Sequence, residues 1–201
     1  MIAEGAATAA FAISGVIEAA RKRMDAVGIC VVGALAAFGG GTLRDLLLQR
    51  RPFFWVQHVG WIWFVLALCV GAMFIMRARH VAPTERAMQW PDAIGLGLFT
   101  ATGTQISLEA GSPALVAVIF GMMTAVFGGV LRDIVCNEIP RAFSDHRPYA
   151  ICAFIGGWVL VLLSHLDIPM SAALLAAATL TTALRVLAIA LDWRLPAWRA
   201  D

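Results

Sequence analysis

The sequence predicts an all-α integral membrane protein with seven transmembrane helices, arranged as two inverted three-helix repeats followed by one extra helix. Three observations predict this fold class. Hydrophobic residues make up 61% of the chain and charged residues only 14%, against roughly a quarter charged in soluble domains. The apolar residues fall into seven segments long enough to cross a bilayer. The first three segments match the next three when the chain is shifted by 88 residues.

Each apolar segment is close to the roughly 20 residues that a helix needs to span the hydrocarbon core. The loops between the segments are short, and none is long enough to fold alone. The expected segments run from Ile2 to Ala20, Val27 to Gln49, Val59 to Met76, Asp92 to Leu108, Ala114 to Cys136, Tyr149 to His165 and Ser171 to Leu191. We therefore expect a first repeat over 1–88, an inverted second repeat over 89–168, and a last helix with a C-terminal tail over 169–201.

The basic residues gather on alternate loops, which predicts the orientation of the chain. Ten of the fifteen Lys and Arg residues fall on one side of the expected membrane, and only Arg50 and Arg51 fall on the other. The ten are Arg21, Lys22, Arg23, Arg77, Arg79, Arg86, Arg141, Arg147, Arg194 and Arg199. By the positive-inside rule this side is cytoplasmic, so the N-terminus is expected outside and the C-terminus inside.

The shift of 88 residues aligns glycines, a charged motif and a proline in the two halves. It places Gly15 on Gly103, Gly33 on Gly121, Gly40-Gly41 on Gly128-Gly129, Leu43-Arg44-Asp45 on Leu131-Arg132-Asp133, and Pro52 on Pro140. Because each unit contains three spans, the second copy must enter the bilayer upside down relative to the first. Inverted repeats of this kind predict a shared pathway or binding site near the midplane, between the second and fifth helices.

The glycines of the duplicated motif are candidates for shaping that pathway. They are Gly39, Gly40 and Gly41 in the second helix, and Gly128 and Gly129 in the fifth. Paired glycines lower the cost of bending, so a kinked helix could release backbone carbonyls as ligands for a monovalent cation. The alternative is that the glycines only allow the helices to pack closely. The duplication favours the kinked, pathway-lining interpretation.

The charged residues of the motif are Arg44, Asp45, Arg132 and Asp133. An arginine near the centre of a span costs roughly 2.5 to 3.5 kcal/mol on insertion scales, so both should face protein or water. Adjacent helical positions point about 100° apart, so we expect each arginine to find its partner on another helix. The two Arg-Asp units are expected to flank two vestibules. Alternatively they are structural pairs that hold the kinks and never meet a permeant ion.

Small hydroxyl residues provide a possible polar lining. They are Ser14 in the first helix, Thr42 in the second, and Thr102 and Thr104 in the fourth. The alternative is that these hydroxyls bond back to carbonyls of their own helices. The second repeat has Val130 in the place of Thr42, so the two halves are chemically unequal.

Other functional classes find no support in the sequence. There is no nucleophile elbow, phosphate-binding loop or metalloprotease motif, so we expect no enzyme activity. The four histidines and four cysteines lack the spacing of metal ligands, and no cofactor is expected. A net charge of +2, scattered over short loops, does not indicate a nucleic-acid partner.

Several of these motifs together make the chain resemble a bacterial member of the trimeric intracellular cation (TRIC) channel family. They are residues 10–15, residues 25–28, both GGxxRD motifs, Pro52 and residues 92–96. The resemblance implies a homotrimer in the bacterial inner membrane, surrounded by lipids, with a pore in each protomer. It also implies glycine-kinked second and fifth helices and passive conduction of monovalent cations, potassium or sodium, chiefly potassium.

A secondary transporter is the alternative function. Inverted repeats with broken helices also describe many carriers, in which a substrate site lies near the midplane between the repeats. Nothing in the sequence separates a continuous pore from such an occluded site.

Overall fold

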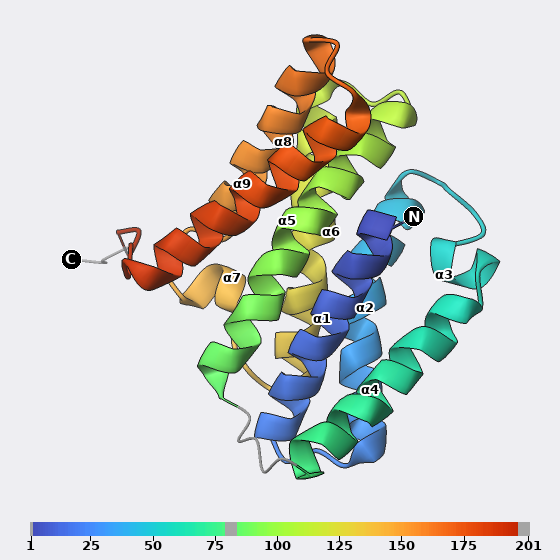
Figure 1. Cartoon of the computed structure of the whole chain (residues 1–201), viewed down its shortest axis with the longest axis vertical. Helices are drawn as coiled ribbons and strands as arrows, with labels where there is room; N and C mark the ends of the chain where they lie inside the picture. Colours follow the sequence, from blue (N-terminus) through green and yellow to red (C-terminus); the bar gives the residue numbers. More distant parts are fainter. Residues whose placement is uncertain (1, 79–83, 197–201) are drawn as a thin grey trace.

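The computed structural model describes residues 2–78 and 84–196, and its regular elements in those ranges are all helices (Figure 1). They are α1 (Ile2–Arg21), α2 (Ala26–Leu47), α3 (Phe54–Gln57), α4 (Gly60–Ala78), α5 (Glu85–Glu109), α6 (Ala114–Val135), α7 (Arg141–Ser144), α8 (Ala150–His165) and α9 (Met170–Ala190). Seven of them are long, and α3 and α7 are single turns. Arg79 and Arg199, counted above among the basic loop residues, lie outside the described residues.

Four long helices form the centre of the molecule. α1 packs on α2 and α5, and α6 packs on α2 and α5. α4 lies against α1 and α2, while α8 lies against α5 and α6 (Figure 1). The two halves therefore place their third long helix on the outside of the core in the same way. α9 covers α5 and α8 and has no counterpart in the first half.

The expected segments agree with the long helices to within two residues at both ends, except for the fourth. α5 begins at Glu85, seven residues before the expected start at Asp92. The Thr84 hydroxyl accepts a hydrogen bond of 3.1 Å from the Ala87 amide and so caps the helix, and Pro91 lies within it. The segment from Glu85 to Pro91, expected to be a loop, is therefore helical. The expected boundary between the first and second repeats, after residue 88, falls inside α5.

The outer surface of the fold is apolar, while several charged side chains are buried within it. Large apolar side chains point outward, such as Trp63, Phe74 and Leu175, each about 70% exposed, while Arg44 and Arg132 are buried. This arrangement suits lipid as the surrounding solvent. By length and composition α2, α6 and α9 could cross a membrane, and the apolar stretches of α4 and α8 are shorter.

Gly39, Gly40 and Gly128 lie where α2 and α6 cross, while Gly41 faces Phe54 and Gly129 faces Arg132 and Tyr149. Both helices continue through their glycines without interruption. A Cβ at Gly40 would overlap the carbonyl oxygen of Thr124, and one at Gly128 would overlap that of Ala36. These two contacts are equivalent under the 88-residue shift. The backbones of α2 and α6 thus touch directly, which is the close packing named above as the alternative, and the kink stays a prediction.

Candidate functional site

Two charged clusters occupy equivalent places in the two repeats. We call Glu4, Arg44 and Asp45 the Arg44 corner, and Asp92, Arg132 and Asp133 the Arg132 corner. The 88-residue shift places each member of one corner on a member of the other, including Glu4 on Asp92. Because the repeats are inverted, the corners lie at opposite ends of the four-helix core.

Each motif arginine binds the aspartate that follows it in the chain. Arg44 Nε lies 2.9 Å from Asp45 Oδ1, and Arg132 Nε lies 2.8 Å from Asp133 Oδ1. The expectation that adjacent residues would not pair is therefore wrong. The arginine side chain is long enough to fold back across the helix surface and reach its neighbour. The expectation of a partner on another helix is also met, since Arg44 contacts Glu4 of α1 and Arg132 contacts Asp92 of α5.

The second oxygen of each motif aspartate explains the two short helices. Asp45 Oδ2 accepts a hydrogen bond of 3.3 Å from the Phe54 amide at the start of α3. Asp133 Oδ2 accepts one of 2.9 Å from the Arg141 amide at the start of α7. A carboxylate at the first amides of a helix satisfies donors that have no partner within the helix. Each motif aspartate thus caps a turn of helix in a segment expected to be a loop.

The Arg132 corner is tightly closed. Arg132 Nη1 lies 2.6 Å from Asp92 Oδ1 and also donates to the Ser14 hydroxyl. The Tyr149 hydroxyl donates to Asp92 Oδ2 at 2.8 Å. The three side chains of the corner are buried, and so are the Ser14 and Tyr149 side chains that contact them. The space beside Arg132 and Tyr149 amounts to only about 10 Å³, which is hardly the volume for one water molecule.

The Arg44 corner, in contrast, opens into a cavity of about 530 Å³. Glu4 Oε1 is 3.4 Å from Arg44 Nη1, and the Glu4 side chain is 21% exposed. The repeat equivalents of Tyr149 and Ser14 are Trp61, which has no hydroxyl, and Thr102, whose hydroxyl donates to the Leu98 carbonyl at 2.8 Å. Glu4 therefore lacks the two hydroxyl contacts that surround Asp92. The charged and polar lining residues of the cavity are Glu4, Arg44, Asp45, Gln49, Arg50, Arg51, Gln57, His58, Thr102, Gln105 and Glu109.

The candidate hydroxyl residues behave in three ways. Thr42 and Thr102 donate to carbonyls four residues earlier in their own helices, as the alternative reading has it, although Thr102 also lines the cavity. Ser14 belongs to the Arg132 corner. The Thr104 hydroxyl is buried and has no hydrogen-bond partner among the described residues.

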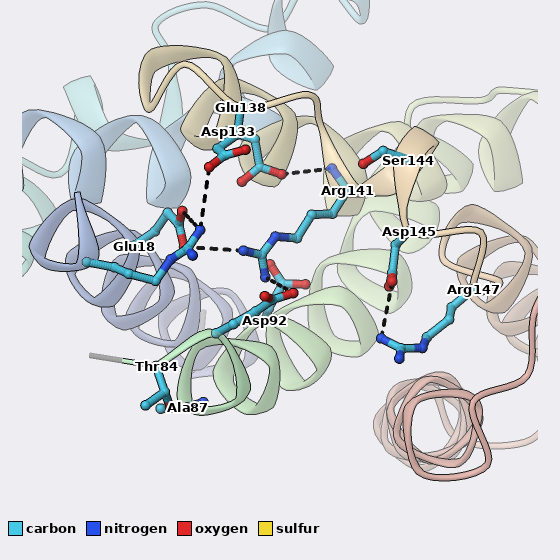
Figure 2. A network of polar contacts seen from close by, with 12 residues as sticks. Glu18, Thr84, Ala87, Asp92, Asp133, Glu138, Arg141, Ser144, Asp145 and Arg147 are labelled. Carbon is cyan, nitrogen blue, oxygen red and sulfur yellow. Dashed lines mark hydrogen bonds and ion pairs between the residues drawn. The ribbon is translucent and has the colours of Figure 1, made fainter. Parts of the chain in front are cut away.

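A network of ion pairs around Arg141 lies next to Asp133 of the Arg132 corner (Figure 2). We call it the α1–α7 network. Arg141 of α7 lies 3.5 Å from Glu18 of α1 and 3.4 Å from Glu85 of α5, and Lys22 pairs with Glu138. Lys22 above all, with Arg21 and Arg141, holds the pKa of the Glu138 carboxyl below its ordinary value. The end of α6 and α7 are thereby tied to α1 and α5.

Several members of these clusters lie outside the duplicated motif. Glu4 and Asp92 could have been found, because the 88-residue shift places one acidic residue on the other. Tyr149 carries no such signal. Arg185 stands out as a charge inside the last apolar segment, from which it could reach a motif aspartate or extend toward the cytoplasm, but the structure pairs it with Asp145 instead. Arg185 of α9 is buried, lies 3.0 Å from Asp145 Oδ2 and stacks 4.7 Å from the centre of the Tyr149 ring. These contacts join α9 and α8 to the Arg132 corner and arise only from the packing of distant segments.

Comparison with known proteins places the chain in a family. The family model described as "Glycine transporter" matches residues 1–79 and 89–165. The UPF0126 inner membrane protein YadS of Escherichia coli (strain K12) is 34% identical over 96% of this chain and 93% of its own length. A UPF0126 membrane protein of Vibrio cholerae is 34% identical over 94% of this chain and 78% of its own length.

Solved structures give the same fold. A TRIC cation channel studied for its conductance is 34% identical and superposes with a TM-score of 0.87 over 100% of this chain and 97% of its own. The TRIC orthologue from Rhodobacter sphaeroides is 32% identical, with a TM-score of 0.88 over 95% of this chain and 97% of its own. These relatives are channels rather than enzymes, and the curated relatives are membrane proteins. The chain therefore belongs to the glycine transporter family of membrane proteins, and its resemblance to the bacterial TRIC channels is confirmed.

Proposed function

We propose that this chain is a passive channel for monovalent cations, chiefly potassium, with one pathway through each protomer of a homotrimer. The seven long helices span the bacterial inner membrane in contact with lipids, as two inverted repeats, 1–88 and 89–168, and a last unit, 169–201. The N-terminus is outside and the C-terminus is cytoplasmic. The pathway runs through the four-helix core from the Arg44 corner to the Arg132 corner, and Gly39–Gly41, Gly128 and Gly129 shape it.

The cavity at the Arg44 corner is the observation that carries this proposal. It measures about 530 Å³ and brings Glu4, Asp45 and Glu109 to one end of the core. Repeat symmetry places the closed Arg132 corner at the opposite end. A polar cavity at one end and a closed polar cluster at the other are what a channel in a closed state requires. A polar pathway through lipid must be buried in protein or filled with water.

The preference for cations rests on two supports. Arg44, the arginine deepest in the cavity, is bound between Asp45 and Glu4, so its charge is balanced locally. The remaining lining arginines, Arg50 and Arg51, are exposed residues at the rim. The relatives of known structure at 34% and 32% identity are cation channels. Balanced charge in the cavity makes cation passage compatible with the buried arginine.

Single-channel recording tests the proposal directly. Purified protein in a planar bilayer under a KCl gradient should give discrete steps that reverse near the potassium potential. Gly129→Leu should abolish or strongly reduce them, because a side chain at Gly129 would point toward Arg132, Tyr149 and Asp92. Gly71→Leu is the matched control, since nothing lies within 4 Å of a Cβ there. Silence of the wild type in the bilayer would contradict the channel.

A glycine carrier is the second candidate. The cavity holds guanidinium groups, at Arg50 and Arg51, and a carboxylate, at Glu109, which suit the two charges of a free amino acid. The matching family model is described as a glycine transporter. A cavity open at one end and closed at the other is also the form of an occluding carrier. In this case wild-type liposomes would take up labelled glycine saturably, and unlabelled glycine would compete, without single-channel steps.

A further inference from the structure

We propose that the stacked rings of Phe11 and Phe99 form the permeability barrier between the two charged corners. The inference rests on the proposed pathway, and it assigns the central closure of that pathway to one pair of side chains. The two phenylalanines are repeat equivalents, since 88 residues separate them. Their ring centres lie 5.5 Å apart with the planes inclined by 23°. Residues that are equivalent and in contact must lie at the pseudo-two-fold axis, in the middle of the core.

The rings fill the space inside the four-helix core. Phe11 is 0% and Phe99 2% exposed. Both belong to one apolar cluster with Ala36 of α2 and Ala125 of α6, so residues from all four core helices surround them. A Cβ at Gly95 of α5 would lie 2.5 Å from the Phe11 ring. The ring therefore packs directly against the backbone of α5 at this glycine.

The polar residues on α1 and α5 lie on both sides of the aromatic pair. On α1, Phe11 lies between Glu4 of the Arg44 corner and Ser14 of the Arg132 corner. On α5, which runs antiparallel, Phe99 lies between Asp92 and Thr102. Glu4 and Thr102 line the same cavity, and Ser14 contacts Asp92. Along the core, the cavity at the Arg44 corner is therefore followed by the aromatic pair and then by the polar cluster at the Arg132 corner.

α2 and α6 narrow the same core from their side. Their backbones touch at Gly40 and Gly128, where even a methyl group would overlap a carbonyl oxygen of the facing helix. An ion that crosses the core from the cavity to the Arg132 corner therefore meets the rings, which stand between α1 and α5. A constriction with apolar walls excludes water and so removes the hydration that an ion needs, and such constrictions gate channels by dewetting.

Cysteine modification tests the barrier independently of what the protein carries. In a chain whose four native cysteines are replaced by alanine, Thr102→Cys reports the cavity and Ser14→Cys reports the far side of the rings. A charged, water-soluble thiosulfonate reagent is applied to protein in nanodiscs. Adding Phe11→Ala and Phe99→Ala together is expected to raise the modification rate of Ser14→Cys about tenfold or more, because the dry gap becomes wet. The rate at Thr102→Cys should change little.

Potassium flux is measured on the same aromatic variants in liposomes, without the reporter cysteines. The double alanine variant should conduct faster than the wild type, whereas Phe154→Ala should not. Phe154 is the control because it also contacts another aromatic ring, Trp158, edge to face, but lies on α8 outside the four core helices. Should the double variant fail to fold, Phe11→Leu and Phe99→Leu singly keep most of the apolar volume, and each should still raise the Ser14→Cys rate.

The outcomes separate the barrier from the proposed function. Faster modification at Ser14→Cys with faster potassium flux supports both. Faster modification without any potassium flux supports the barrier and overturns the channel. A folded variant with unchanged modification overturns the barrier, whatever the flux does, and leaves the wild-type recording to decide on the channel.

Discussion

Asp92 and Glu4 occupy the same place in the two repeats, yet their environments differ in burial and in hydrogen bonding. Asp92 receives the Tyr149 hydroxyl and binds a fully buried guanidinium at 2.6 Å. Glu4 is partly exposed and lies 3.4 Å from its arginine. Removing one partner of a buried ion pair is costly because the other charge is left without compensation, while an exposed pair contributes little. The two residues thus form a natural matched pair for mutation.

Asp92→Asn is expected to destabilise the protein by about 3 to 5 kcal/mol, the usual cost of breaking a buried pair. Glu4→Gln should cost about 1 kcal/mol or less, because Arg44 keeps Asp45 and the site is partly hydrated. Unfolding of both variants in detergent, followed by circular dichroism, gives the comparison. Equal losses would mean that the two corners do not differ as described.

Glu138 gives a pH-dependent prediction at the same scale. Its carboxyl has a lowered pKa in the folded protein, chiefly through the hydrogen bond from Lys22. The stabilisation is then fully present above the ordinary glutamate pKa of about 4.3, and it is lost as the pH falls through the lowered value. The wild-type Tm should therefore fall more between about pH 5 and pH 3 than that of Glu138→Gln. Parallel curves for the two proteins would exclude this contribution.

The helices differ in how far the sequence could predict them. Six of the seven long helices were predicted within two residues because apolar length is set by the bilayer and is visible in composition. The start of α5 was missed because Arg86 and Pro91 in its first turns resemble a loop. α3 and α7 could not be predicted because a single turn has no periodicity, and the carboxylates of Asp45 and Asp133 that cap them come from other helices.

The candidate site was predicted in part for a similar physical reason. The duplicated motif identified Arg44, Asp45, Arg132 and Asp133, since charge inside an apolar segment stands out. Which carboxylate, hydroxyl or ring each would meet depends on how α1, α5 and α8 pack. The pairing with the adjacent aspartate also depends on side-chain conformation, which helix geometry alone does not determine.

The glycines of α2 and α4 provide a prediction about helix packing. Gly40→Ala should destabilise the protein by about 1 to 3 kcal/mol, the usual cost of overpacking, because the new methyl group would overlap the Thr124 carbonyl. Gly71→Ala should stabilise it by about 0.4 to 1 kcal/mol, since the site is helical and open. Chemical unfolding of the two variants beside the wild type measures both. A neutral Gly40→Ala would mean that α2 and α6 are further apart than described.

The whole molecule consists of two inverted halves with different ends. The cavity at one end measures about 530 Å³ and the equivalent space at the other about 10 Å³. The α1–α7 network adds ion pairs only at the closed end. Two features accompany the difference between the ends: substitutions between the repeats, such as Tyr149 in place of Trp61, and the contacts of Arg185 on α9, a helix without a counterpart in the first half.

The proposed orientation can be tested on intact cells. Gln57 and Asp192 are both exposed residues beside helix ends, and they fall on opposite sides of the proposed membrane. With the native cysteines replaced, an impermeant maleimide should label Gln57→Cys in intact cells, and Asp192→Cys only after permeabilisation. The reverse pattern would place the N-terminus in the cytoplasm.

The unequal corners show two arrangements of one structural unit. Two copies of one plan, folded within a single chain, differ in that the Arg44 corner opens into a cavity and the Arg132 corner is closed. Turning the second repeat onto the first about the pseudo-two-fold axis describes a closed Arg44 corner, and the opposite rotation describes an open Arg132 corner. Each half therefore provides a structural template for the corner arrangement that the other half does not have.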